Sequence, residues 1–91
     1  MDRQSDEDWW QNFRQLLDDQ NDWPAEYLFK FIVPRDGLEQ MKEVFGGHPV
    51  TIRASNKGNY ASVTARIEMS SSEEVVAIYS AAAEVEGVVS L

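Results

Sequence analysis

The sequence predicts one α+β domain of the ferredoxin-like class, with a four-stranded antiparallel sheet in the order 4-1-3-2 and two helices on one face. Residues 49–55 and 60–69 alternate between apolar and polar side chains, as half-buried strands do. The predicted elements follow one another as a helix and then βαββαβ, and the right-handed crossover rule converts that order into this fold. A chain of 91 residues allows one domain with a thin core.

The first predicted element is a helix over residues 5–17, which has Ser5 and Asp8 placed as a capping box. Its large apolar residues recur on one helical stripe: Trp9, Trp10, Phe13, Leu16 and Leu17. The polar run 18–22 breaks this pattern and predicts a linker. Residues 1–22 are therefore expected to be an acidic amphipathic extension, and residues 23–91 the domain.

Residues 26–33 are rich in aromatic and β-branched types and predict the first strand, which ends at Pro34. Both faces of this strand are largely apolar, as is typical of a central strand covered on both sides. Asp36 is placed to cap a helix that runs to about Phe45, where two glycines end it.

The segment 56–59 predicts a hairpin turn between the second and third strands, with Gly58 at positive φ. Ser71 and Glu74 form a second capping box, which begins a helix expected to run to about Glu86. Residues 87–91 predict a short last strand, and Gly87 ends the helix before it.

Composition excludes several classes of function. The net charge is −8, of which residues 1–22 carry −5 with seven acids and two bases. So acidic a chain has no general attraction to nucleic acid or to an anionic membrane. The absence of cysteine excludes disulfides, thiol nucleophiles and thiolate metal sites. No apolar run approaches the length of a membrane span, and no signal peptide is visible, so we expect a cytoplasmic protein.

Several segments together resemble the YbeD-like family of uncharacterised bacterial proteins. These segments, all within residues 24–91, are Tyr27–Pro34, Phe45–Val50, Ser55–Tyr60, Ser62–Thr64 and Val85–Val88. The most specific part is the run over residues 55–63, S-N-K-G-N-Y-A-S-V. The resemblance implies a ferredoxin-like fold similar to regulatory domains of the ACT type, which sense small molecules. It implies no established activity, and a regulatory or adaptor role follows only by analogy of fold.

The candidate binding residues lie in the turn that defines the resemblance, together with the only histidine. They are Ser55, Asn56, Lys57, Gly58, Asn59, Tyr60 and His48. The turn can present a lysine and backbone amides to an anion or a carboxylate, although turn geometry alone also explains its asparagine and glycine. His48 lacks a recognisable nucleophile or ligand partner, and a loop residue bonded to the backbone is the favoured interpretation.

Two further features have competing interpretations. The segment 34–38 lies where ACT-type domains place a ligand-binding glycine turn, but capping by Asp36 is favoured. One sheet face is expected to be polar and basic, as in RNA-binding sheets, and consists of Lys30, Thr51, Arg53, Tyr60, Ser62, Thr64 and Arg66. It lacks the paired aromatic residues that stack bases in such sheets.

We therefore expect a non-enzymatic regulatory or protein-interaction module with no cofactor and no metal. The alternatives are a sensor of a small amino-acid-like ligand and an RNA-binding sheet. The stripe Trp9, Trp10, Phe13, Leu16 and Leu17 is expected to dock on the open sheet face, over Leu28 and Ile32, in its own chain or exchanged within a homodimer. The sequence does not identify a protein partner.

Overall fold

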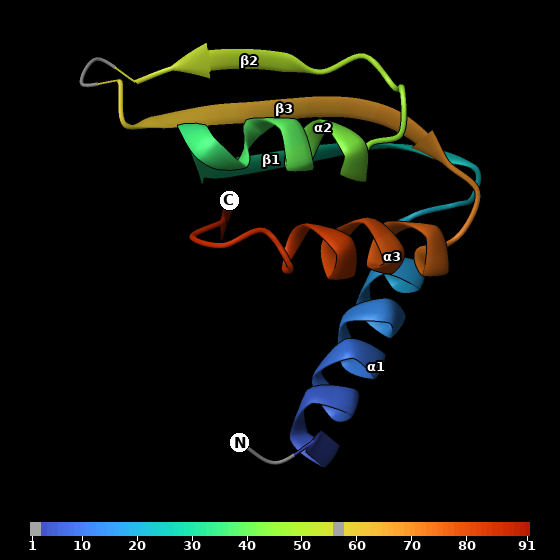
Figure 1. Ribbon diagram of the computed structural model, residues 1–91. Coiled ribbons are helices and arrows are strands. Elements are labelled where there is room, and N and C mark those ends of the chain that lie inside the picture. The colour runs from blue at the N-terminus through green and yellow to red at the C-terminus, as the bar shows by residue number, and fades with distance from the viewer. Residues whose placement is uncertain (1–2, 56–57) are drawn as a thin grey trace.

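The computed structural model describes residues 3–55 and 58–91, with side chains described for residues 7–55 and 58–91. Its centre is an antiparallel pair of long strands, β1 (Ala25–Pro34) and β3 (Tyr60–Met69). The short strand β2 (Thr51–Ala54) lies outside β3, and β4 (Val89–Ser90) lies outside β1. The resulting order β2-β3-β1-β4 confirms the predicted topology (Figure 1).

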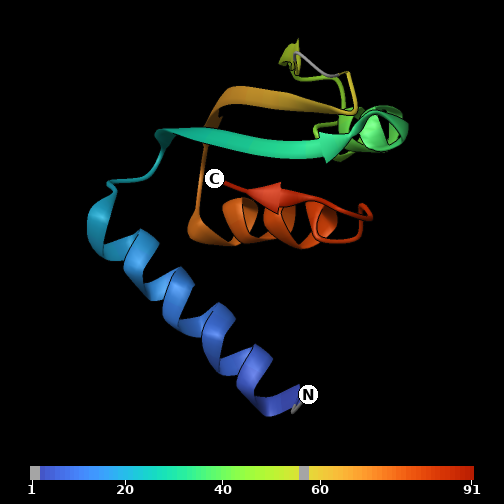
Figure 2. The same cartoon turned by 90° about the vertical axis from the view of Figure 1, so that its left-hand side faces the viewer.

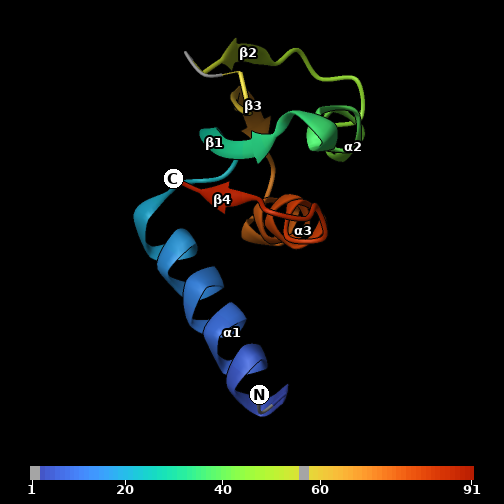
Figure 3. The same ribbon diagram turned by 60° about the vertical axis from the view of Figure 1, so that its left-hand side comes forward.

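Two helices cover one face of this sheet, as Figure 3 shows with the strands seen nearly end-on. The first is α2 (Leu38–Val44), preceded by the three-residue 3-10 helix η1 (Arg35–Gly37), and the second is α3 (Ser72–Ala82). The core between the helices and the sheet is apolar. On β1 it contains Phe29, Phe31 and Val33, and the other elements and loops add Met41, Phe45, Val63 and Val75. The fold is therefore ferredoxin-like, as expected.

The N-terminal helix α1 (Arg3–Gln20) is longer than predicted at both ends. Ser5 lies inside the helix and is not its N-cap. The helix also continues through Asp18 and Asp19, which were expected in the linker. Its C-terminal turn is held by two side chains of the real linker, since Asn21 donates to the Leu17 carbonyl at 3.0 Å and the Trp23 indole donates to the Asp18 carboxylate at 2.9 Å.

The predicted docking of α1 on the open sheet face of its own chain is wrong. The helix packs against α3, and its N-terminal half projects away from the rest of the domain (Figures 1 and 2). Leu17 is 5% exposed and belongs to the core, and Phe13 meets the ring of Tyr79 edge-on at 5.4 Å. A four-residue linker, 21–24, leaves little freedom once these contacts form.

The expectation that β1 is covered on both sides is also wrong. One face meets the helices, whereas Leu28 on the other face remains half exposed. The alternation of β2 is correct, but Ile52 and Ala54 are exposed at the sheet edge even though they point to the helix side.

Asp36 does not cap the second helix. It lies within η1, and the N-cap of α2 is Gly37, which makes no side-chain cap bond. Gly37 has no room for a side chain, because an added Cβ would lie 2.9 Å from Val85 Cγ1. Close packing of the two crossover connections therefore favours glycine at this N-cap.

The capping box at α3 is present with one change. The Ser71 hydroxyl accepts from the Glu74 amide at 3.3 Å, and the Glu74 carboxylate accepts from the amide of Ser70. The helix ends at Ala82, four residues before the predicted end, although Val85 is still buried.

Candidate functional site

The first candidate binding surface is the sheet face opposite α2 and α3. The strand register identifies the side chains on this face, because directly opposed residues point to the same side. The backbone amide of Leu91 donates to the Lys30 carbonyl at 2.9 Å and continues the row. We call this surface the open face, defined by Glu26, Leu28, Lys30, Ile32, Thr51, Arg53, Tyr60, Ser62, Thr64, Arg66, Glu68, Val89 and Leu91.

Large apolar side chains are exposed along one side of the open face. Leu28 is 51% exposed, Val89 50% and Leu91 62%, and Ile32 lies between them partly buried. The helices α2 and α3 cover the opposite face of the sheet, and α1 packs against α3. Together they form an apolar patch on β1 and β4 of the kind that marks interaction sites.

Basic groups border this patch. Lys30 and Arg53 form no ion pair with any described residue, whereas Arg66 lies 3.5 Å from Glu26 in an exposed pair. Exposed pairs of this kind contribute little energy, so Arg66 can exchange partners at low cost. The open face therefore combines an apolar floor with local positive charge on a chain of net charge −8.

A small hollow of about 170 Å³ lies at the end of the open face near the hairpin turn. Its residues come from all three of the longer strands and their ends: Ile32, Arg53, Ala54, Ser55, Tyr60, Ala61 and Ser62. Its size suits one large side chain. Tyr60 is the one aromatic residue among those defining the open face, which argues against a base-stacking platform for RNA.

The hairpin turn is closed by its own hydrogen bonds. The Ser55 amide donates to the Tyr60 carbonyl at 2.8 Å, and the Gly58 amide donates to the Ser55 carbonyl at 3.0 Å. Gly58 has φ +74°, as predicted. The Arg35 amide donates to the Asn59 carbonyl at 3.2 Å, which ties the turn to η1. Two of the predicted binding residues, Asn56 and Lys57, lie outside the described residues.

His48 is not brought together with this turn. It lies before β2, at the opposite end of the sheet, where its amide donates to the Phe45 carbonyl at 3.1 Å. There it borders a separate cavity of about 380 Å³ that also contains Glu68 and Glu74. The predicted group of binding residues therefore divides into two separate places.

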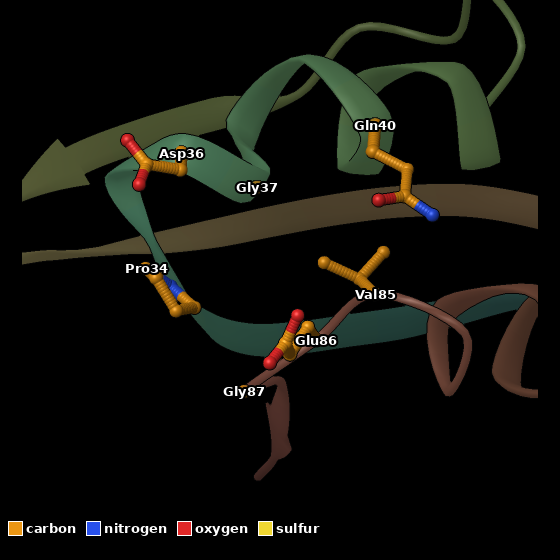
Figure 4. Close-up of a pocket in the computed structure, with 7 residues that line it drawn as sticks. All are labelled: Pro34, Asp36, Gly37, Gln40, Val85, Glu86 and Gly87. Atoms are coloured by element: carbon orange, nitrogen blue, oxygen red, sulfur yellow. The ribbon is translucent and has the colours of Figure 1, made fainter.

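A larger cavity, of about 490 Å³, lies where the two crossover connections meet. Figure 4 shows Asp36, Gly37 and Gln40 on one side of it and Val85, Glu86 and Gly87 on the other, with Pro34 at the end of β1. It includes part of the predicted glycine turn. Sequence reasoning missed Glu86 as a lining residue because the helix was expected to continue through it.

A pair of tyrosines links β1 to α3 beneath α1. The Tyr27 and Tyr79 hydroxyl oxygens lie 3.2 Å apart in a hydrogen bond. Burial, reinforced by this bond, raises the pKa of Tyr79 far above its ordinary value. Tyr79 is therefore held as the neutral phenol.

Neither a metal site nor a membrane span is found in the part of the chain that the structure describes. No group of three or more histidine or carboxylate side chains could hold a metal ion among the described residues. None of the described helices is long and apolar enough to cross a bilayer.

Comparison with known proteins shows the family. The family model described as "Protein of unknown function (DUF493)" matches residues 18–91, which leaves most of α1 outside the match. A UPF0250 protein of Shewanella loihica is 35% identical over 83 residues, covering 84% of this chain and 90% of that protein. UPF0250 proteins of Shewanella piezotolerans and Shewanella oneidensis are 32% and 30% identical over 79 residues, each covering 79% of this chain and 90% of the relative.

No solved structure matches the chain. The family match confirms the resemblance seen in the hairpin and its flanking strands, and its description assigns no activity. The chain belongs to the DUF493 family, the UPF0250 or YbeD-like proteins.

Proposed function

We propose that the domain is a non-enzymatic protein-interaction module that binds its partner through the open face. The observation that supports this proposal is the exposure of Leu28, Val89 and Leu91 on a sheet face that no described helix covers. Apolar burial supplies most of the free energy of association, at about 25 cal/mol per Å² removed from water. A partner that covers these side chains gains that energy.

The bases beside the patch give the interaction its selectivity. Lys30 lies between Leu28 and Ile32 on β1, and Arg53 borders the hollow. A carboxylate placed against either of them satisfies a charge that has no described ion-pair partner. Such charges steer association and choose between partners more than they add affinity. The expected partner surface is therefore apolar and acidic.

The test is capture of partners from the native cell with matched variants. Leu91→Asp places a charge in the patch, and Ala81→Asp places the same charge at an exposed position of α3. We expect Leu91→Asp to lose proteins that the wild type and Ala81→Asp both retain. Equal capture by all three chains, with equal urea midpoints, would count against the open face as the binding surface.

A second candidate function is a sensor of a small amino-acid-like ligand, supported by the cavity between the crossover connections. Its volume of about 490 Å³ falls in the range of small-molecule sites, and Asp36 and Glu86 can receive an ammonium group. None of its lining residues is basic, so it offers no side-chain partner for the carboxylate of an amino acid. A thermal-shift screen with amino acids and amines tests this candidate. Stabilisation that Glu86→Gln abolishes would favour it over the interaction module.

A further inference from the structure

The N-terminal helix has an exposed apolar edge, although the Trp9 ring stacks on Phe13 at 5.4 Å and meets Trp10 edge-on at 4.8 Å. Trp9 is 59% exposed and Leu16 is 51% exposed. They lie seven residues apart, so they share one side of the helix. Asp8 and Asp19 are exposed and lie roughly a quarter turn away, on the side opposite the contact with α3. The exposed edge is therefore apolar with acidic groups beside it.

This edge cannot reach the open face of its own chain while the helix stays docked. Leu17 is buried in the core, and Phe13 packs against Tyr79 of α3. Asn21 and Trp23 fasten the last helical turn to the linker. Moving the edge over the sheet would release these contacts, and burying one leucine alone is worth about 2 kcal/mol.

The dimensions of the exposed edge match those of the open face. Trp9 and Leu16 are separated by about 10 Å along the helix axis. On β1 the hollow beside Ile32 and the exposed Leu28 are four residues apart, which is about 13 Å. With Trp9 in the hollow, Leu16 therefore lies near Leu28. The hollow also contains Arg53, whose guanidinium can contact the indole ring.

The charges match in the same orientation. Asp8 and Asp19 are about 16 Å apart along the helix. Arg53 is opposite Ser62 on β3, four residues before Arg66, so the two arginines lie about 14 Å apart on the sheet. With Trp9 in the hollow, Asp8 approaches Arg53 and Asp19 approaches Arg66. A helix aligned with the strands thus places both carboxylates near bases.

We propose that the occupant of the open face is the exposed edge of α1 from a second copy of this chain. This inference rests on the proposed function and names its partner. The contact is heterologous, because the exposed edge of α1 on one copy meets the open face of the other. A pair of copies therefore retains one unused helix edge, on one copy, and one unused face, on the other, so the association continues from chain to chain unless a ring closes.

The test is sedimentation velocity of the full chain at increasing concentration, up to about 1 mM, where even weak association is populated. The wild type is expected to sediment faster as concentration rises, and less so at high salt. Trp9→Ser and Arg53→Glu should each weaken the association at least about tenfold. Their controls, Gln11→Ser and Lys42→Glu, make matched changes at exposed positions outside the two surfaces and should behave as the wild type.

Mixing the two defective variants gives the decisive result. Trp9→Ser keeps an intact face, and Arg53→Glu keeps an intact helix edge. Their equimolar mixture should form a species of two chains and no larger one. A wild type that remains monomeric, or a mixture that remains monomeric, would overturn the inference. The proposed function would survive that result if Leu91→Asp still lost captured partners, and it would fail separately if capture were unchanged.

Discussion

Substitution of Gly87 tests whether the two crossover connections are packed as closely as the structure shows. Gly87 has φ +79°, and a Cβ added there would lie 2.8 Å from Pro34 Cγ and 3.2 Å from Pro34 Cδ. Gly87→Ala therefore adds backbone strain and a collision with a rigid ring at the end of β1. We expect it to lower the free energy of unfolding substantially.

The magnitude follows from two contributions. Left-handed backbone costs a residue with a Cβ roughly 1–2 kcal/mol, partly offset by the lower entropy of the unfolded chain. Overpacking costs about 1–3 kcal/mol more. The expected loss is therefore about 2–4 kcal/mol.

Gly58→Ala is the matched control. Gly58 has φ +74°, but its added Cβ would lie 3.5 Å from Arg35 Nη1, an ordinary contact with a flexible side chain. The Gly58→Ala variant should lose only about 1 kcal/mol of its free energy of unfolding, through backbone strain. Urea unfolding followed by circular dichroism measures both. Equal losses for Gly87→Ala and Gly58→Ala would refute the close contact with Pro34.

Three further predictions concern α1, α3 and the tyrosine pair. Leu17→Ala should lower the free energy of unfolding by about 2–4 kcal/mol, because Leu17 lies in the core. Leu16→Ala should lower it by under about 1 kcal/mol, because Leu16 is exposed, and thermal unfolding measures both. Similar losses would contradict the docking of α1 on α3. Ser71→Ala should cost about 1 kcal/mol through loss of the α3 cap, measured by urea unfolding. Because the folded chain raises the pKa of Tyr79, the contribution of Tyr79 to the free energy of unfolding should be constant below about pH 10 and fall as pH rises above it. Tyr79→Phe should reduce that fall, and an unchanged pH profile would refute its assignment to this residue.

The sequence was sufficient for the topology because local signals agreed with one another. The alternation in 60–69 predicts β3 with its observed bounds, and the Ser71 cap marks where α3 begins. The glycine at 58 predicts the turn that pairs β2 with β3. Each of these signals depends on neighbouring residues only, which is why sequence alone reveals it.

The errors concern long-range packing. The two apolar faces of β1 were interpreted as burial on both sides, although Leu28 remains half exposed. The stripe of α1 predicted a buried helix without indicating which surface buries it, and Leu17 and Phe13 meet α3. Where Asp36 was expected to cap, the N-cap is Gly37, which lies too close to Val85 to carry a side chain without a shift.

The candidate site was partly foreseen. The register confirms that Lys30, Arg53 and Arg66 share one face, as predicted. The contribution of Val89 and Leu91 was missed, although their spacing of two residues signals a common side of the last strand. The turn and His48 were grouped because one carries the family resemblance and the other is the only histidine in the sequence. The fold places them at opposite ends of the sheet.

The most direct test of the open face is site-specific photo-crosslinking in the native cell. A photoreactive residue at Thr64 lies in the middle of the open face, and one at Glu39 lies on the exposed side of α2. Binding through the open face predicts protein crosslinks from Thr64, either to a second copy or to another protein, and far fewer from Glu39. Crosslinks from Glu39 with none from Thr64 would contradict it.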